Sequence, residues 1–424
     1  MPQWRETIKR AIPVALLHSL EQLRDRISAP AFEDTHLFEY EAVADSSLVP
    51  RLSMVMPSID PAWAFGGVTT GIDIFLDLCH RTGAEPRFIT EGKADRDVVG
   101  RRALKFGLTP EYVEDIGRPN RVVRMPVRAT DLFLTYNWWT TLNIRPLLDA
   151  QMRLFGGSPR PFIYLIQDYE PSFYGFSSTH MLARLAIEQD RPCWGVFNSS
   201  QLHTFFAAQG HHLERTYVFE PKISQSLRPA LDAGPTLKTK QILVYGRPTV
   251  PRNCFPAIEK GLRLWASRYP QFADWEVVSA GLAHNPIPIG PGRAVCSAGK
   301  LSLEAYADLL RTTAVGLSLM SSPHPSYPPL EMAHFGLLTI TNKYANKDLS
   351  TAHDNFVSIP DIDGATIAAA LAQACERFEA NPDIGWQGQS HMQAYLDPAE
   401  WGFLPDLAND LRRVWKSAGA AVAI

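Results

Sequence analysis

The sequence predicts an α/β protein built from two doubly wound domains that face each other across a central cleft. Three observations support this fold class. A chain of 424 residues is long for a single hydrophobic core. Short apolar segments, typical of buried strands, alternate with helical patterns in both halves of the chain. The alternation lapses once, in a polar, proline-bearing stretch at 221–240 that is typical of a linker.

The first half of the chain contains the first series of alternating elements. We expect strands at 52–56, 86–90, 131–136, 162–167, 193–198 and 216–219, and helices at 69–81, 97–106, 178–190 and 199–209. Such alternation predicts βαβ units and hence a parallel sheet covered by helices. We therefore place a first domain at 51–225, preceded by a helical extension at 1–50. Packing on the protein's own body is the main expectation for this extension, and peripheral contact with a membrane is the alternative.

The second half repeats the pattern after the linker. Strands are expected at 241–245, 275–280, 314–320, 337–341 and 355–359, and helices at 255–268, 302–312 and 365–379. These elements form a second domain at 236–397. The segment 398–424 is predicted to be a helix that returns to the first domain.

Charge and cysteine content exclude several classes of protein. A formal net charge of -3 argues against a protein dedicated to nucleic acid. The five cysteines are scattered, without a CxxC pair, which favours reduced thiols in the cytoplasm. The apolar run at 11–17 is interrupted by Pro13 and is too short to cross a bilayer. We expect a cytoplasmic protein, with the inner face of the cytoplasmic membrane as the alternative location.

The run from Ser326 to Gly336 carries the most informative side chain. Pro328 and Pro329 can open a short helix there, and Gly336 can close it. Glu331 is then expected in the first turn, at the edge of a parallel sheet where nucleotide phosphates and riboses bind in open α/β folds. The alternative is that Glu331 serves only as a favourable partner of the helix dipole.

Two further loops carry groups suited to a phosphorylated ligand. Gly66 and Gly67 precede the first long helix, and paired glycines let a ligand approach the backbone. Arg247 and Arg252 lie on a proline-stiffened loop after the first strand of the second domain. Guanidinium groups bind a diphosphate through paired donors and a charge that does not titrate away. The ordinary alternatives are a tight turn for the glycines and a solvated surface for the arginines.

Polar residues also follow the strand at 162–167. Asp168, Tyr169 and Glu170 are expected at its carboxyl end, facing the cleft, where they could bind a hydroxyl-rich molecule. His180 follows closely, and one member of this group could serve as a catalytic base. Lys300 precedes another predicted helix and is either a phosphate contact or a surface residue.

Motifs for metals and common cofactors are absent from the sequence. The pairs Asp95/Asp97 and Asp361/Asp363 have DxD spacing, but the first lies in a charged loop and the second is typical of a helix N-cap. The sequence contains no HExxH, GxGxxG, Walker or GxSxG motif. We therefore expect neither a metal nor a bound cofactor.

Taken together, the three loops resemble the donor site of GT-B glycosyltransferases of retaining family 4, whose domains are Rossmann-like. The segments 167–171 and 246–253 resemble, more narrowly, WsaF-type rhamnosyltransferases, which build bacterial surface polysaccharides. This resemblance implies a nucleotide-sugar donor, dTDP-L-rhamnose being favoured, and a saccharide or lipid-linked glycan acceptor. Pro323 departs from the broader family, which often has a second glutamate at this position that contacts the donor sugar.

The resemblance also implies roles for individual residues. The donor-binding set is Gly66, Gly67, Arg247, Arg252, Lys300, Tyr327 and Glu331, with Glu331 on the ribose and the arginines on the diphosphate. The catalytic set is Arg247, Arg252 and Asp168, and the acceptor-binding set is Tyr169, Glu170 and His180. Two alternatives to a transferase are a sugar-nucleotide epimerase or hydrolase of the same fold, and a non-catalytic carbohydrate-binding protein.

Overall fold

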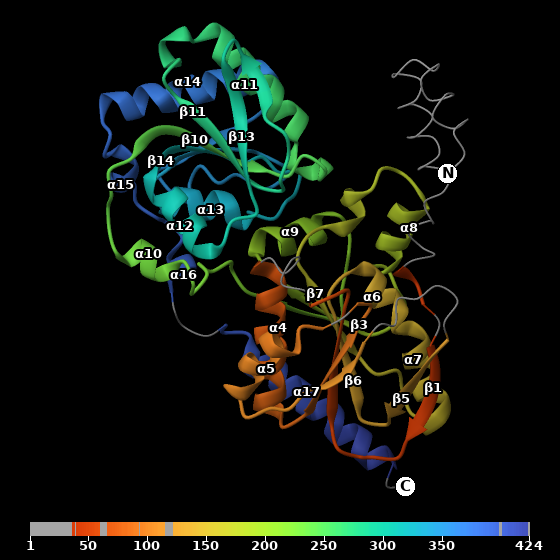
Figure 1. Ribbon diagram of the computed structural model, residues 1–424. Coiled ribbons are helices and arrows are strands. Elements are labelled where there is room, and N and C mark those ends of the chain that lie inside the picture. The colour runs from red at the N-terminus through yellow and green to blue at the C-terminus, as the bar shows by residue number, and fades with distance from the viewer. Residues whose placement is uncertain are drawn as a thin grey trace, which may run out of the picture.

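A computed structural model describes residues 36–38, 40–59, 66–92, 94–114, 122–397 and 401–422. These residues form two α/β domains, one coloured red to green and the other green to blue in Figure 1. Residues 1–35 of the predicted helical extension lie outside the described residues. The described part of that extension corrects the prediction, because Tyr40–Asp45 is a strand, β1. It pairs in parallel with β5 (Val123–Arg128), and Tyr40 is buried in the same apolar cluster as the inward side chains of β5.

The first domain is built around a seven-stranded sheet. Its order is β4-β3-β2-β6-β7-β8-β9, and every neighbouring pair is parallel. The strands are β2 (Arg51–Met56), β3 (Glu85–Thr90), β4 (Glu111–Val113), β6 (Asp131–Thr135), β7 (Phe162–Ile166), β8 (Cys193–Phe197) and β9 (Arg215–Val218). The helices are α4 (Gly66–Thr82), α5 (Arg96–Leu104), α6 (Trp138–Asn143), α7 (Arg145–Phe155), α8 (Ser178–Leu185) and α9 (Ser200–Ala208). Central strands such as β7 are buried on both faces, which explains their continuous apolar sequences.

The second domain has the same architecture. Its sheet has the order β12-β13-β11-β10-β14-β15-β16, and only the edge pair β12–β13 is antiparallel. The strands are β10 (Thr239–Gly246), β11 (Glu276–Gly281), β12 (Ile287–Gly290), β13 (Arg293–Gly299), β14 (Thr313–Leu317), β15 (Leu338–Asn342) and β16 (Phe356–Ile359). The main helices are α11 (Phe255–Arg268), α12 (Leu303–Thr312), α13 (Tyr327–His334) and α14 (Gly364–Ala380).

The chain passes between the domains twice, and the two passages are bonded to each other. The predicted linker contains a short helix, α10 (Arg228–Asp232), and the return passage contains α15 (Ile384–Gln387) and α16 (Gln393–Leu396). The Ile223 amide donates to the Tyr395 carbonyl over 3.0 Å, and Arg228 Nη1 donates to the Leu396 carbonyl over 2.6 Å. These contacts join the two connections at the hinge between the domains.

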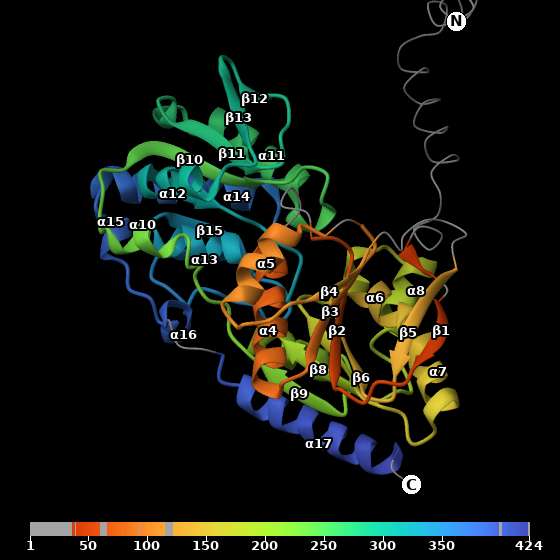
Figure 2. The same cartoon turned by 60° about the horizontal axis from the view of Figure 1, so that its bottom comes forward.

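The final helix, α17 (Leu404–Val422), lies against the first domain beside α4, as both views of the molecule show (Figures 1 and 2). Leu407, Leu411 and Trp415 enter the core beneath α4, and the Trp415 indole N–H donates to the Thr130 carbonyl over 2.7 Å. This packing ties the end of the chain to the first domain. No helix among the described residues is long and apolar enough to span a membrane.

Candidate functional site

The candidate site is the region where the carboxyl ends of the two parallel sheets meet. In the first domain, β7 ends directly before Gln167 and Asp168. In the second, β10 leads to the loop with the two arginines, and β14 leads to α13. Direct bonds join the two walls. The Ser322 hydroxyl donates to Asp168 Oδ1 over 2.5 Å, and the Asn346 amide donates to the Gln201 carbonyl over 2.8 Å.

Asp168 lies at the centre of this junction. Its side chain is buried, and Oδ1 also accepts a hydrogen bond from the Tyr169 amide over 2.8 Å. Burial raises the pKa of the carboxyl, and the positive charge of Arg252 opposes that rise. Lys347 from the second domain is also electrostatically coupled to Asp168, and burial lowers the pKa of its ammonium to about 8. The carboxylate is therefore electrostatically coupled to two cations of the other domain, Arg252 and Lys347.

Arg252 is held on the β10–α11 loop in the short 3₁₀ helix η2 (Pro251–Asn253). Its backbone carbonyl accepts from the Ser321 amide over 2.8 Å, which links the loop to the segment leading into α13. Its guanidinium carbon lies 4.0 Å from the ring centre of Phe173, a residue of the first domain. Arg247 follows β10 directly and is half-buried on the same loop. The structure thus brings both predicted arginines to one loop, with Arg252 reaching across the cleft.

Glu331 lies on α13, but not in its first turn as predicted. The helix begins at Tyr327, one residue earlier than expected, because Ser326 adopts a left-handed φ of 72° and turns the chain into the helix. Glu331 is therefore the fifth helical residue. Its Oε2 accepts from the Tyr306 hydroxyl over 3.0 Å, and burial raises the pKa of the carboxyl to about 7. Gly336 ends the helix with a φ of 76°, as predicted.

The helix that begins with the glycine pair is contacted by Tyr327 of the second domain. Gly66 and Gly67 begin α4, and a Cβ added to Gly67 would overlap Gln167 Oε1. Only glycine therefore fits between α4 and the end of β7 without displacing that side chain. The Tyr327 hydroxyl hydrogen-bonds Thr70, one turn further along α4. Tyr327 consequently connects the helix that carries Glu331 to the glycine-led helix of the first domain.

Of the three residues predicted to bind the acceptor, Glu170 is the most firmly held. Glu170 opens the 3₁₀ helix η1 (Glu170–Phe173), and its Oε2 accepts from the Trp138 amide over 2.6 Å and the Tyr164 hydroxyl over 2.7 Å. Burial raises the pKa of Glu170 to about 7.

Tyr169 and His180 contact the body of the first domain. The Tyr169 ring packs edge-on against Phe205 and Phe206, and its hydroxyl lies 3.1 Å from His211 Nε2. His180 Nδ1 lies 2.8 Å from the Pro171 carbonyl, behind η1. These contacts support the position of η1. The acceptor role of both residues stays a prediction.

Several buried polar atoms in the cleft lack a hydrogen-bond partner among the described residues. They are Gln167 Nε2, Arg252 Nε and Asn253 Oδ1. Buried polar atoms of native proteins are nearly always bonded, so these three atoms, which come from both domains, are candidates to bind a polar ligand or water. No cluster of His, Cys, Asp and Glu in the described parts of the chain has the geometry of a metal site.

Comparison with known protein families identifies the relatives of this chain. A model of the WsaF N-terminal domain matches residues 51–200, and a model of the WsaF C-terminal domain matches residues 240–372. Together the two models cover more than half of the chain, in the expected order. The chain belongs to the WsaF family. The two matches coincide with the two α/β domains of the structure, so the WsaF family assignment and the fold agree.

Individual relatives support the same fold. The O-antigen biosynthesis protein RfbC of Myxococcus xanthus is 31% identical over 291 residues, which is 66% of this WsaF-family chain and 21% of that protein. The chain therefore spans about a fifth of that relative's length. WaaG, a glycosyltransferase involved in lipopolysaccharide biosynthesis, aligns with a TM-score of 0.53 at 12% identity, covering 85% of this chain and 99% of WaaG.

A trehalose 6-phosphate synthase from Burkholderia multivorans aligns with a TM-score of 0.51 at 11% identity, covering 88% of this chain and 98% of the synthase. At such low identity these two structural matches speak to the fold alone. They show that this WsaF-family chain has the GT-B fold, as the sequence predicted.

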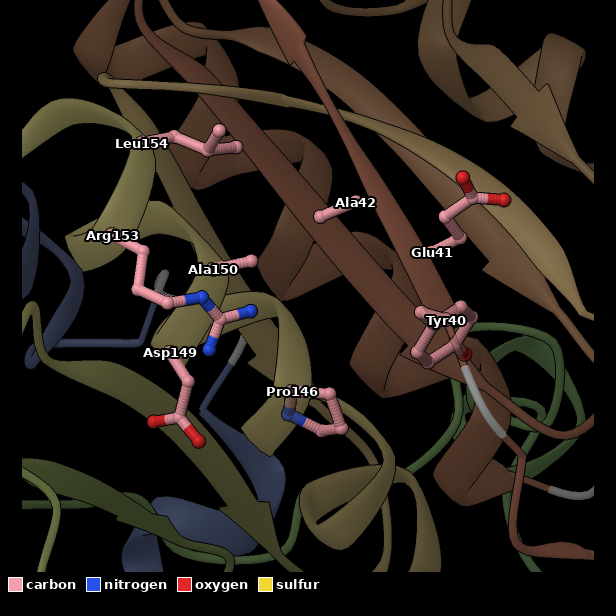
Figure 3. A pocket seen from close by; sticks show the side chains of 8 residues that line it. All are labelled: Tyr40, Glu41, Ala42, Pro146, Asp149, Ala150, Arg153 and Leu154. Carbon is pink, nitrogen blue, oxygen red and sulfur yellow. The ribbon is translucent and has the colours of Figure 1, made fainter.

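One predicted site residue and one pocket lie apart from the residues that meet at the junction of the two domains. Lys300 is exposed at the end of β13, at the outer part of the same sheet edge. A separate open pocket of about 440 Å³ lies between β1 and α7 of the first domain (Figure 3). Its lining includes Tyr40, Asp149 and Arg153, and none of the predicted site residues. The predicted catalytic and binding residues of this WsaF-family chain therefore lie outside this pocket.

Lys347 and Ser322 are the cleft residues that sequence reasoning missed. Lys347 follows β15 in a short turn, and Ser322 lies in the segment between β14 and α13. The only signal available was their position after strands of the second sheet, since a lone lysine and a lone serine in a loop are otherwise typical surface residues.

Proposed function

We propose that this WsaF-family chain transfers a sugar from a nucleoside diphosphate donor to a saccharide acceptor during assembly of a bacterial surface polysaccharide. L-Rhamnose is the favoured sugar, and dTDP-L-rhamnose is the favoured donor. The observation that carries the proposal is the junction in which Asp168 of one domain accepts a hydrogen bond from Ser322 of the other and is electrostatically coupled to Arg252. The names of RfbC and WaaG, which refer to O-antigen and lipopolysaccharide biosynthesis, support the polysaccharide context.

The donor is proposed to bind to the second domain. Glu331 would accept hydrogen bonds from the ribose, and Arg247 and Arg252 would bind the diphosphate, with Lys300 and Tyr327 at the edges. Breaking the bond between the sugar and the diphosphate leaves negative charge on the leaving group, and preorganised donors stabilise such charge strongly in a dry cleft. Two arginines can supply this stabilisation, so we propose transfer without a metal ion or cofactor.

The acceptor is proposed to approach from the first domain. Asp168 would lie beside the reacting centre, because its carboxylate is electrostatically coupled to Arg252 and is hydrogen-bonded to Ser322 of the second domain. Glu170 has one oxygen fixed by two donors and can position an acceptor hydroxyl with the other. Gly66 and Gly67 would leave room for the sugar phosphate next to α4. A cytoplasmic location, with peripheral contact to the membrane that carries a lipid-linked acceptor, completes the proposal.

Nucleotide binding tests the site before any acceptor is known. We expect dTDP, and to a smaller degree UDP or GDP, to raise the melting temperature of the protein. At a ligand concentration of 100 times Kd, the stabilisation is about 2.7 kcal/mol. If none of the three nucleotides changes the melting temperature, the proposed function is wrong.

Turnover then separates the transferase from its two rivals. The protein is incubated with dTDP-L-rhamnose, with and without a pool of saccharide acceptors, and released dTDP and sugar products are measured. An epimerase or hydrolase converts the donor without acceptor, whereas a transferase needs one. In cells, Arg252→Ala and Glu331→Ala should abolish the glycan product. An unchanged glycan in both variants would instead support a non-catalytic binding protein.

A further inference from the structure

Glu331 is held in a cluster of tyrosines. Tyr306 comes from α12, Tyr327 from α13 itself, Tyr245 from the end of β10, and Tyr395 from α16. Among the residues that the structure describes, only the Tyr306 hydroxyl hydrogen-bonds the Glu331 carboxylate, over 3.0 Å between Oη and Oε2. This leaves Oε1 as the free acceptor of the carboxylate.

The position of Tyr306 is fixed by the start of its helix. The Ser302 side chain caps α12 by accepting from the Ala305 amide over 3.2 Å. Ala307 and Leu310 anchor the same helix in the core that also contains Leu330 and Ala333 of α13. Tyr306 therefore faces α13 from a rigid support, which is the requirement for a residue that orients another side chain.

We propose that Tyr306 is the positioning residue for the nucleotide site, holding one oxygen of Glu331 so that the other accepts from the ribose hydroxyl of the donor. The inference rests on the proposed function, since it assigns Glu331 to the ribose. It adds a residue on a different helix whose hydroxyl controls both the orientation and the ionisation of the binding carboxylate.

The charge of Glu331 makes this role measurable. Burial raises its pKa to about 7, and the Tyr306 hydroxyl opposes that rise. Burial raises the pKa values of Tyr327 and Tyr395 above their usual range, and the negative charge of Glu331 adds to this rise. His334, one turn further along α13, has a pKa lowered to about 4 by burial and stays neutral. Glu331 is therefore the group of this cluster that titrates near neutral pH.

The sign of the effect follows from which form binds. A ribose hydroxyl donates to the carboxylate, so the ionised form binds and affinity rises as pH increases through about 7. Replacing Tyr306 with phenylalanine removes a hydrogen bond that favours the ionised form. The pH at which affinity levels off must then move upward.

The experiment measures the Kd of dTDP by titration calorimetry between pH 6 and 9. The proteins are wild type, Tyr306→Phe, Glu331→Gln and the double variant, with Tyr112→Phe as a matched control. Tyr112 is a partly buried tyrosine of the first domain. Melting curves establish that each variant is folded. The dTDP phosphate titrates in the same way with every protein, so its effect cancels when the Kd of a variant is divided by the Kd of the wild type.

We expect Tyr306→Phe to bind dTDP about tenfold more weakly at pH 7, the scale of one hydrogen bond to a charged group, and the deficit should shrink toward pH 9. Glu331→Gln should lose the rise of affinity near pH 7, and adding Tyr306→Phe to it should change Kd by less than about twofold. Tyr112→Phe should match wild type.

Two results would overturn the inference alone: a deficit that is the same at every pH, or an equal deficit with and without Glu331. Wild-type protein that binds none of dTDP, UDP and GDP would overturn the proposed function, and this inference with it.

Discussion

Replacing Arg252 with methionine tests the donor site directly, because methionine keeps the unbranched apolar part of the side chain and removes the charged guanidinium. The guanidinium lies 4.0 Å from the Phe173 ring centre, and its Nε has no hydrogen-bond partner among the described residues. Loss of the cation–π contact costs about 0.5–1 kcal/mol of stability. Loss of a fixed donor to the leaving group costs about 2.7–4 kcal/mol in the transition state, which is 10²–10³-fold in kcat. The variant should thus stay folded and lose transfer.

The assay measures kcat/KM for sugar transfer together with the melting temperature. We expect the melting temperature of Arg252→Met to fall by no more than about 3 °C, from the usual relation between stability and melting temperature for a chain of this size. Arg96→Met is the matched control, because Arg96 also lies over an aromatic ring, 4.9 Å from the centre of Tyr112, but belongs to the other domain from Arg252 and is not one of the predicted site residues. The control should keep wild-type turnover. The reasoning is refuted if Arg252→Met retains kcat/KM within about threefold of wild type, or if Arg96→Met loses as much activity.

Four further substitutions separate residues that act in sugar transfer from residues that support the fold. Asp168→Asn keeps the hydrogen bond from Ser322 and removes the charge, so transfer should fall at least about 100-fold while Ser322→Ala costs only a few-fold, both measured as kcat/KM; equal losses would assign the effect to the bond instead. Lys238→Met should lower the free energy of unfolding in urea by about 2–4 kcal/mol, because the buried Lys238 ammonium donates to four backbone carbonyls at the ends of α12 and α13; an unchanged midpoint would contradict this. Trp415→Ala should destabilise the protein by about 3–5 kcal/mol by opening the core under α4, and unaltered thermal melting would show that the packing of α17 adds nothing.

The sequence predicted most of the buried strands and helices, but few of the strands near the edges of the sheets. The helix expected at 255–268 has those bounds in the structure, and the strands around 162–167 and 193–198 differ from the prediction by one residue at one end. Continuous apolar runs and strong helical periodicity carry these predictions. The strands β5, β12 and β13 were missed. β5 and the four-residue edge strand β12 each contain a proline, and β13, which lies between β12 and β11, has only one buried residue, Val295. Edge strands are buried on one side at most, so their sequences lack the apolar signal.

The site could be predicted as a set of loops but not as a set of contacts. Parallel sheets place the carboxyl ends of their strands on one edge, so the loops of Arg252, Asp168 and Glu331 could be assigned to the cleft in advance. The bond between Asp168 and Ser322 depends on how the two domains are oriented, which no local pattern encodes. Tyr306 was overlooked for a related reason. A tyrosine in an amphipathic helix is usually a packing residue, and its meeting with Glu331 is set by the packing of α12 against α13.

The contacts that join the domains also bear on how a donor could enter. Arg252 rests on Phe173, a contact worth about 0.5–1 kcal/mol, and each hydrogen bond between the arginine and a phosphate contributes about 1.5–3 kcal/mol. An entering diphosphate therefore gains more from Arg252 than the protein loses by releasing Phe173. The aromatic ring holds the guanidinium at little cost, and the buried atom Nε has no hydrogen-bond partner among the described residues. If Arg252 binds the donor as proposed, these magnitudes predict that Phe173 prepares the guanidinium for the donor and does not compete with it.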